Sequence, residues 1–301
     1  RMPAAFCGVY GHRPSETAWP RSGSFPLAVH PNVSAVMGVQ GPLARSAYDL
    51  ELAIDEGATP EPGEDIAWRL HLPPSRHDSL TGFRVAILPG IPWVPVSSEV
   101  RARLDELASW LSRTGAKVAE VSPRIDWRAH YLDYSRTLMS RMSTAQPVEE
   151  RQGIAGALRA RGDDENAALA DGLTLAATDF YQLMDRREAY RRQYREFFRD
   201  WDVLLTPMAL GEPFPHTDLP FAERTLEIDG ERVSYRLQVF YPSVATFAGQ
   251  SATAFPGGLS RAGLPLGLQV LGPYLEDRTP LRFVQLLEDE RGGFVPPPGY
   301  E

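Results

Sequence analysis

Lysine is almost absent from this chain of 301 residues, because only Lys117 among its 31 basic residues is a lysine. No lysine stands in a G-x-x-x-x-G-K-[ST] pattern, which excludes a phosphate-binding loop of that type. Lys117 lies where a predicted helix gives way to a predicted strand, a setting typical of exposed lysines, and nothing there suggests the burial that would make it a base. A mechanism that needs a lysine base must therefore use Lys117 or a residue outside these 301 positions.

Cysteine is equally scarce, since Cys7 is the one cysteine of the chain. A disulfide within the chain and a cysteine-based zinc cluster are therefore excluded. The segment Phe6-Cys7-Gly8-Val9 predicts a thiol packed in the interior, although His12 is close enough in sequence for a nucleophilic role to be considered. The six histidines are scattered and H-E-x-x-H is absent, so we expect no metal site and no cofactor.

Long apolar runs and a positive net charge are missing as well. No run approaches the length of a membrane span, and the basic-then-apolar layout of a signal peptide is absent from the N-terminus. The net charge of -8 argues against a bulk affinity for nucleic acid or anionic lipid. We therefore expect a cytoplasmic globular protein without a nucleic-acid or membrane partner.

The clearest structural pattern runs from Phe83 to Val121. A short apolar run at 83–88 predicts a buried strand, and a helix with Ser97 or Ser98 as N-cap follows. Gly115 fits the left-handed residue that ends such a helix, and 117–121 predicts a second strand. Strand, helix and strand with short links indicate a parallel pair.

Other segments predict helices from about Ser46, over 178–201 and over 279–288. The apolar run in 202–207 predicts a strand that ends at Thr206-Pro207. Ligands of open α/β sheets gather where strands end, so Thr206 is a candidate pocket residue.

Gly249 to Thr253 comes close to the G-x-S-x-G nucleophile elbow but lacks its last glycine. No strand followed by a clear helix surrounds the segment, and Pro256 interrupts any helix there. The sequence therefore predicts a structural role for Ser251. No complete catalytic group is visible in the chain.

Three separated segments resemble motifs of the amidase signature family. The first is like the flank of its nucleophile, G-G-S-[IV]-R-x-P-A-x-F-C-G-[VL]-x-G-x-[KR]-P, and matches at Arg1, Pro3, Ala4, Phe6, Cys7, Gly8, Gly11, Arg13 and Pro14. The second, Gly38 to Asp49, looks like G-P-[ML]-A-R-[ST]-x-x-D-L from Gly41 onward. The third, Phe255 to Asp277, is similar to P-x-G followed by G-[LI]-P-x-G-x-Q and a glycine, and 202–207 resembles the family's D-V-L-L-T-P.

The resemblance implies an α/β fold with a mixed β-sheet core flanked by helices. We take residues 1–301 as a single domain of this type, incomplete at its N-terminus. It further implies hydrolysis of a small carboxamide by a Ser–cis-Ser–Lys triad, in which a neutral lysine draws a proton from the nucleophile through the middle serine. The nucleophile would fall two positions before Arg1, so no catalytic residue is expected within the chain, which alone should be inactive.

The motif positions imply that Ala252 and Phe255, with Thr206 nearby, form the substrate-binding wall. A plain core role is as good an interpretation of Phe255, and Thr246 to Ala252 departs from the family's N-L-x-G-x-P-A at the asparagine and the proline. The resemblance leaves a homodimer open.

Two other functions compete with a stand-alone amidase. The amidase subunit of a tRNA-dependent amidotransferase normally carries Y-D-G-x-x-Y-G, absent here, and an aspartate where this chain aligns Val239. The third interpretation is a scaffold or binding module derived from an amidase.

Overall fold

The computed structural model describes residues 1–22 and 36–300. These residues form two compact units, one of residues 1–122 with 195–301 and the other of Pro123–Tyr194. The sequence-based assignment of residues 1–301 to a single domain stays a prediction, because a division into compact units does not test it. Among the helices of the described ranges, none combines the length and the apolar composition that crossing a bilayer requires.

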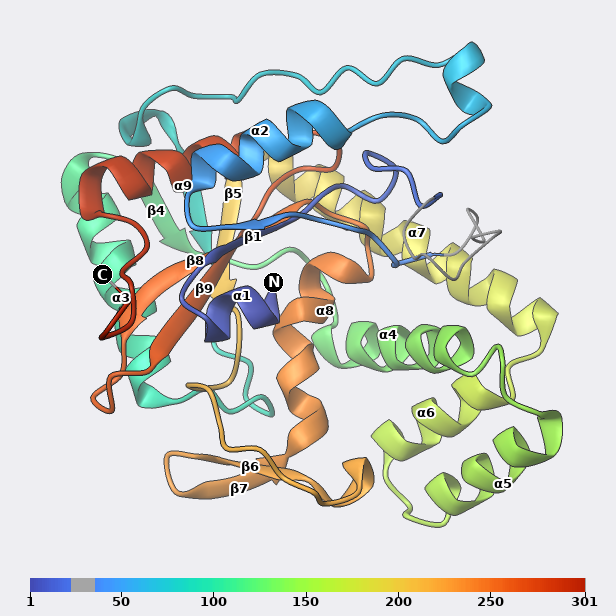
Figure 1. Ribbon diagram of the computed structural model, residues 1–301. Helices are drawn as coiled ribbons and strands as arrows, with labels where there is room; N and C mark the ends of the chain where they lie inside the picture. The colour runs from blue at the N-terminus through green and yellow to red at the C-terminus, as the bar shows by residue number, and fades with distance from the viewer. Residues whose placement is uncertain (23–35, 301) are drawn as a thin grey trace. The chain divides into compact units, whose positions relative to one another are not determined.

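The larger unit is built on a seven-stranded sheet whose order is β2-β1-β8-β9-β5-β3-β4 (Figure 1). Its strands are β1 (Tyr10–Arg13), β2 (Leu43–Ala44), β3 (Arg84–Ile87), β4 (Lys117–Glu120), β5 (Val203–Pro207), β8 (Ala252–Leu259) and β9 (Pro265–Leu271). Strand β3 pairs in parallel with β4 and with β5, whereas the other pairs are antiparallel. The predicted α/β fold with a mixed sheet is confirmed.

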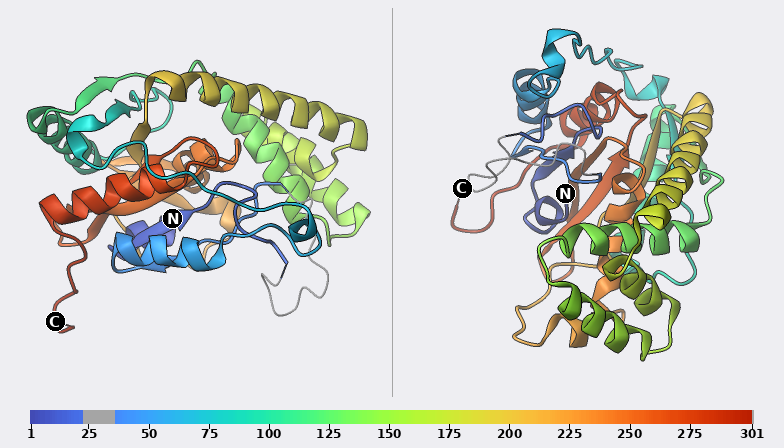
Figure 2. Two further views of the ribbon diagram at one scale, coloured as in Figure 1. Left: turned by 90° about the horizontal axis from the view of Figure 1, so that it is seen from above. Right: turned by 90° about the vertical axis from the view of Figure 1, so that its right-hand side faces the viewer.

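One face of this sheet carries the main hydrophobic core. Helices α2 (Ala47–Gly57), α3 (Ser98–Thr114) and α9 (Arg278–Arg291) bury their apolar stripes there, and α2 lies beside α9 (Figures 1 and 2). The sheet contributes alternate residues of its central strands to the same cluster, among them Val203, Leu205, Phe255, Leu268 and Val270. The opposite face receives the short helix α1 (Met2–Phe6), whose Ala4 and Ala5 pack with Met208 and Ala254.

Helix α3 shows how closely local sequence sets an element. The Ser97 hydroxyl accepts a hydrogen bond from the Val100 N–H at 3.3 Å, and such a cap is worth about 1 kcal/mol. At the other end Gly115 has φ of 98°, the left-handed conformation that favours glycine. The predicted caps, the helix between them and the parallel pairing of β3 with β4 are all confirmed.

Shorter elements join these strands and helices. Helix α8 spans Phe240–Thr246. The described residues also contain four short 3-10 helices, which are η1 (Glu64–Ile66), η2 (Leu80–Gly82), η3 (Phe221–Glu223) and η4 (Tyr235–Val239). Strands β6 (Thr225–Ile228) and β7 (Glu231–Ser234) form a separate hairpin. Its turn residues Asp229 and Gly230 both have positive φ, 50° and 83°, as a two-residue Asp-Gly hairpin turn requires.

The smaller unit is helical. It contains α4 (Trp127–Met142), α5 (Val148–Arg159), α6 (Asp164–Leu173) and the larger part of α7 (Ala177–Asp200). Helix α7 confirms the helix predicted over 178–201, whereas α4, α5 and α6 were not predicted. Within this unit Asp133 of α4 accepts hydrogen bonds from Arg136 at 3.1 Å and from Arg186 at 3.0 Å. Burial lowers the pKa of His130 to about 3, so its ring is neutral at physiological pH.

Candidate active site

The segment that carries the nucleophile-flank motif folds into α1 and β1 on one face of the sheet. Helix α1 can lie directly on the strands because two motif glycines face it. A Cβ atom at Gly11 would stand 2.7 Å from the Ala4 Cβ, and one at Gly267 would stand 2.2 Å from the Ala5 Cβ. Both distances are shorter than real Cβ contacts, so these positions require glycine. The spacing of small residues in the motif is thus explained by the contact between helix and sheet.

Arg1 is the polar centre of this face. Its guanidinium donates to the Gln269 Oε1 atom, to the Pro242 carbonyl oxygen at 3.0 Å and to the Thr246 hydroxyl at 2.8 Å. Pro242 and Thr246 belong to α8, and Gln269 belongs to β9. Hydrogen bonds of this charge-assisted kind are stronger than neutral ones. The arginine therefore joins the start of α1 to a helix and to a strand that are distant in sequence.

Gln269 extends the network to β5. Its side-chain amide nitrogen donates to the Thr206 hydroxyl at 2.9 Å and to the Tyr241 carbonyl oxygen at 2.8 Å. Gln269 and Thr206 are fully buried, and each is the other's partner in the β5–β9 register. Because buried polar groups are stable only when hydrogen-bonded, the network specifies these side-chain positions. We refer to Arg1, Thr206, Thr246 and Gln269 as the arginine network.

The three residues predicted to bind substrate do not come together. Thr206 and Ala252 face the side of the sheet that carries the arginine network, because Gln269 pairs with Thr206 and with Ala254, two positions after Ala252. Phe255 directly follows Ala254 in a regular stretch of β8 and therefore faces the opposite side, where it belongs to the main core. Ala252 is fully buried in the sheet. The substrate-binding role of all three residues stays a prediction.

Two cavities of the larger unit bear on this assignment. One, of about 570 Å³, lies past the end of β5 and is lined by Phe6, Leu210, Phe214, Tyr235 and Gln238 among others. Its aromatic rings meet edge to face, with centroids 5.6 Å apart for Phe6 and Phe214. This is the edge of the sheet at which ligands of α/β folds gather. We refer to it as the aromatic cavity.

The other cavity, also of about 570 Å³, contains Phe255 and lies by the main core. Cys7, Tyr10 and Leu268 line it together with residues of α9 and of the segment that follows α9. Cys7 is exposed, so the prediction of a buried thiol was wrong. The reason is its position: Cys7 follows the last residue of α1, at the point where the chain turns toward β1.

Sequence reasoning missed a buried hydroxyl–imidazole–carboxylate chain. His12 Nδ1 lies 2.8 Å from the Thr253 hydroxyl, and His12 Nε2 lies 3.3 Å from an Asp277 carboxylate oxygen. Asp277 also accepts hydrogen bonds from the Ser15 N–H at 2.7 Å and from the Ser15 hydroxyl at 2.6 Å. All four residues are buried and none lines a cavity described above. The arrangement therefore joins β1 and β8 to the start of α9 rather than presenting a nucleophile.

Ser251 has the structural role and Lys117 has the exposed position that the sequence predicted. Ser251 is fully buried between α8 and β8, so it is preceded by a helix and followed by a strand, the reverse of a nucleophile elbow. Its hydroxyl donates to the Pro273 carbonyl oxygen at 3.3 Å. Lys117 is exposed, with its ammonium nitrogen 5.2 Å from the centre of the Trp201 ring. The two do not form a Ser–Lys dyad.

Asp202 of the D-V-L-L-T-P segment directly precedes β5, so it lies at the end of the sheet opposite to the aromatic cavity. Arg84 donates to its two carboxylate oxygens at 2.6 and 3.1 Å, and Arg76 donates to it at 3.2 Å. Burial alone would raise the pKa of Asp202, but hydrogen bonds from the Arg84 side chain and backbone and from Arg76 lower it to about 2. This carboxylate is therefore ionised at every physiological pH and serves as a structural anchor.

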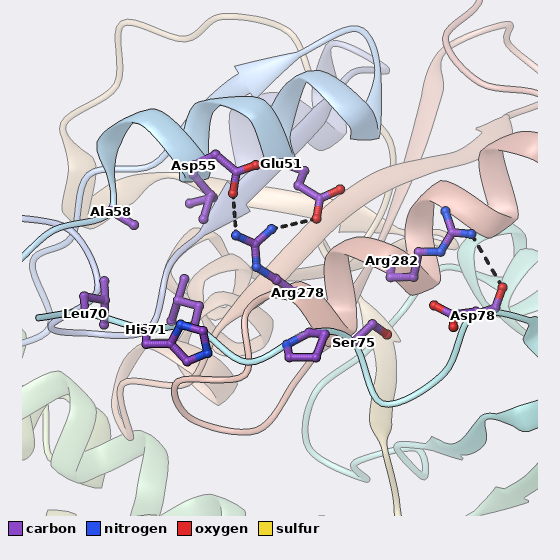
Figure 3. A pocket seen from close by; sticks show the side chains of 12 residues that line it. Glu51, Asp55, Ala58, Leu70, His71, Ser75, Asp78, Arg278 and Arg282 are labelled. Carbon is purple, nitrogen blue, oxygen red and sulfur yellow. Dashed lines mark hydrogen bonds and ion pairs between the residues drawn. The ribbon is translucent and has the colours of Figure 1, made fainter.

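A further cleft of about 550 Å³ lies between α2, α9 and the segment 70–78 (Figure 3). Arg278 stands between two carboxylates in it, 2.9 Å from Glu51 and 2.6 Å from Asp55. Ser75, the hydroxyl in its lining, donates to the His77 carbonyl oxygen at 2.8 Å. The cleft thus offers a satisfied ion pair and no nucleophile with an adjacent base. Within residues 1–22 and 36–300 no three His, Cys, Asp or Glu side chains are grouped as a metal site would need.

Comparison with known proteins places these features in a family. Residues 1–281 match the family model described as Amidase. A glutamyl-tRNA(Gln) amidotransferase subunit of Thermus thermophilus is 30% identical over 96% of this chain and 62% of that protein. A crystal structure of an amidase, 25% identical, superposes with a TM-score of 0.68 over 96% of this chain and 60% of that one.

The solved glutamyl-tRNA(Gln) amidotransferase subunit of Thermotoga maritima has a TM-score of 0.70 and 20% identity, over all of this chain and 63% of that one. At this identity the likeness shows the fold alone. The chain spans about three fifths of the length of the curated relatives named here.

Proposed function

This chain belongs to the amidase signature family, and on that premise we propose that it forms the body of an amidase that hydrolyses a carboxamide to a carboxylate and an amine or ammonia. The observation that carries the proposal is the arginine network. Arg1, Thr206 and Gln269 come from three separate motifs of the family, and hydrogen bonds join them. Three motifs that are far apart in the sequence thus each contribute a residue to the same hydrogen-bond network.

The proposed chemistry is acyl transfer to a serine. In the family motif the nucleophile stands two positions before the arginine that aligns with Arg1, and the cis-serine and the lysine stand further upstream. The nucleophile's oxygen bonds to the amide carbon while its proton passes through the middle serine to the lysine. The amine or ammonia leaves with a proton, and water then releases the carboxylate from the acyl-enzyme. The three groups would come from sequence that precedes the first motif residue.

This chain's own residues contribute positioning. Arg1 fixes the backbone next to the proposed nucleophile, since its guanidinium is held by α8 and β9. We place the acyl group on the face that Thr206 and Ala252 share with Arg1, and its apolar part in the aromatic cavity beside Phe6. A substrate-binding role for Phe255 would require a route from the other face of the sheet. The partner is thus a small-molecule amide, and a cytoplasmic location and a homodimer belong to the same proposal.

A second candidate is the amidase subunit of a tRNA-dependent amidotransferase. The names of the curated relatives favour it, since several are glutamyl-tRNA(Gln) amidotransferase subunits. The absence of Y-D-G-x-x-Y-G and the valine at position 239 favour the stand-alone amidase. A non-catalytic scaffold is the third candidate.

Activity assays separate these three functions. The protein made from its complete reading frame should hydrolyse members of a panel of aryl and aliphatic amides without any partner protein. An Arg1→Ala variant should lose most of its kcat, while the exposed Arg113→Ala variant serves as the matched control. Activity that appears only with partner proteins would favour the amidotransferase, and no activity under either condition would favour the scaffold. Turnover by the 301-residue chain that Ser251→Ala abolishes would contradict the proposal.

Substrate preference tests where the acyl group binds. We expect Phe214→Leu, in the aromatic cavity, to change the ratio of kcat/KM for aryl and aliphatic amides. Phe255→Leu should leave that ratio unchanged and lower stability only, because its ring packs in the main core. The reverse result would assign the substrate wall to Phe255.

A further inference from the structure

A cavity of about 590 Å³ lies at the edge of the sheet opposite to the end of β5. Arg84 begins β3, Asp202 directly precedes β5, and Gln250 stands two residues before β8, so the cavity lies where these strands begin. The last turns of α7 supply Arg195 and Arg199 to its lining. None of these residues takes part in the proposed amide chemistry.

The cavity is rich in arginine. Arg76 is tied to Glu276 at 2.6 Å, and Arg84 is tied to Asp202 at 2.6 Å, so these two guanidinium groups form a neutralised wall. Arg195 and Arg199 add two further positive charges from exposed positions. Counted over the lining alone, four arginine side chains stand against the carboxylates of Asp202 and Glu276, and this composition favours an anion.

Gln250 adds a second, independent requirement. Gln250 is 1% exposed, and its Oε1 atom has no hydrogen-bond partner among the residues that the structure describes. Its backbone is fixed on both sides, since its N–H donates to Ala245 at 3.0 Å and its carbonyl oxygen accepts from Arg13 at 2.7 Å. A buried acceptor without a donor is costly, so this position selects a ligand that supplies one.

We propose that this cavity binds a small oxyanion that carries its own hydrogen-bond donor. The arginine N–H groups donate to the charged oxygens, in the planar geometry that suits phosphate and carboxylate. The donor of the ligand binds the Gln250 Oε1 atom. Hydrogen phosphate combines both features, and so does the carboxylate of an α-amino acid with its ammonium group.

Calorimetric titration of the full chain at neutral pH tests this with phosphate, glycine and sulfate. Sulfate resembles phosphate in shape and charge but has no proton to donate at that pH. We expect phosphate or glycine to bind at one site per chain at least about tenfold more tightly than sulfate. The tighter of the two identifies the source of the anion. Equal affinity for all three, or no binding of phosphate and glycine at millimolar concentration, would overturn the proposal.

Variants assign the binding to these residues. Gln250→Leu keeps the side-chain volume and removes the acceptor, so the preference over sulfate should disappear. Arg195→Gln with Arg199→Gln should weaken every anion by about tenfold. Arg192→Gln, an exposed arginine of the same helix that does not line the cavity, is the control and should bind like the parent.

Thermal unfolding in the absence of anion shows which variants are folded. If Gln250→Leu does not fold, Gln250→Met replaces it, and the arginine variants test the charge separately. A preference for phosphate or glycine that survives in the glutamine variant contradicts the proposal. So does equal weakening in the Arg192 control.

Discussion

Arg1 and Gln269, separated by 268 positions, are joined by a hydrogen bond from the guanidinium to the side-chain amide oxygen. The same amide donates from its nitrogen to Thr206. A glutamine is suited to this position because it offers an acceptor and a donor at once. Neither a glutamate nor a lysine could join a cation on one side to a hydroxyl and a carbonyl oxygen on the other. The first residue of the chain and strand β9 are thus joined on one face of the sheet.

Replacing Gln269 should lower the stability of the fold. Gln269→Leu keeps the volume but removes the donor of the Thr206 hydroxyl and the Tyr241 carbonyl oxygen and one of the three acceptors of the Arg1 guanidinium. We expect the free energy of unfolding to fall by about 2 to 4 kcal/mol in a urea titration. Gln152→Leu, at an exposed position of α5, is the matched control and should stay within about 0.5 kcal/mol. A change in Gln269→Leu as small as in the control would mean that the network contributes little.

A double-mutant cycle should separate the two faces of the sheet. Thr206→Val and Gln269→Leu remove two ends of one hydrogen bond, so their effects should couple by about 1 kcal/mol. Thr206 and Phe255 lie on opposite faces of the sheet. The effects of Thr206→Val and Phe255→Leu on the free energy of unfolding should therefore be additive to within about 0.5 kcal/mol. Strong coupling in the second pair would place Phe255 with the arginine network after all.

Because of Asp202, the free energy of unfolding should depend on pH in the acidic range. Its pKa of about 2 in the folded state is depressed from an unfolded value of about 3.9, so its contribution is present above about pH 4 and is lost as the pH falls toward 2. The shift corresponds to about 2 to 3 kcal/mol. Asp202→Asn should lower the plateau of the stability–pH curve and flatten its slope between those pH values. The exposed neighbour Asp200→Asn should keep the slope of the parent.

The contact between α1 and the sheet should tolerate no added methyl group. Gly267→Ala would place a Cβ atom 2.2 Å from the Ala5 Cβ, and overpacking of this kind costs about 1 to 3 kcal/mol. Gly153→Ala, in helix α5, meets nothing within 4 Å and should raise stability by up to about 1 kcal/mol. Two glycine-to-alanine changes of opposite sign in thermal unfolding would support this account, and equal signs would argue against it.

Local patterns in the sequence were enough for several elements. Ser97, Gly115 and the apolar stripe between them specify α3, because caps and amphipathic spacing act within one helix. The strand before Thr206 was predicted for a similar reason. The family motifs predicted the mixed sheet, although they say nothing about which face a residue occupies.

Other features depend on register and on long-range contacts. Phe255 was grouped with Ala252 by motif position, yet an odd spacing along β8 places them on opposite faces. The His12–Asp277 contact joins residues 265 positions apart, which no local pattern reveals. Helix α4 was missed even though Asp126 caps it by accepting from Arg128 and Ala129. That cap was a signal that sequence reasoning could have used.

In the proposed mechanism the nucleophile is a serine that stands two positions before the arginine aligned with Arg1. The protein made from its complete reading frame can be treated with a serine-directed organophosphonate and digested, and the labelled peptide identified by mass spectrometry. We expect a single label on that serine, and loss of the label when the serine is replaced by alanine. A label on Ser251, or on any other residue between Arg1 and Glu301, would contradict it.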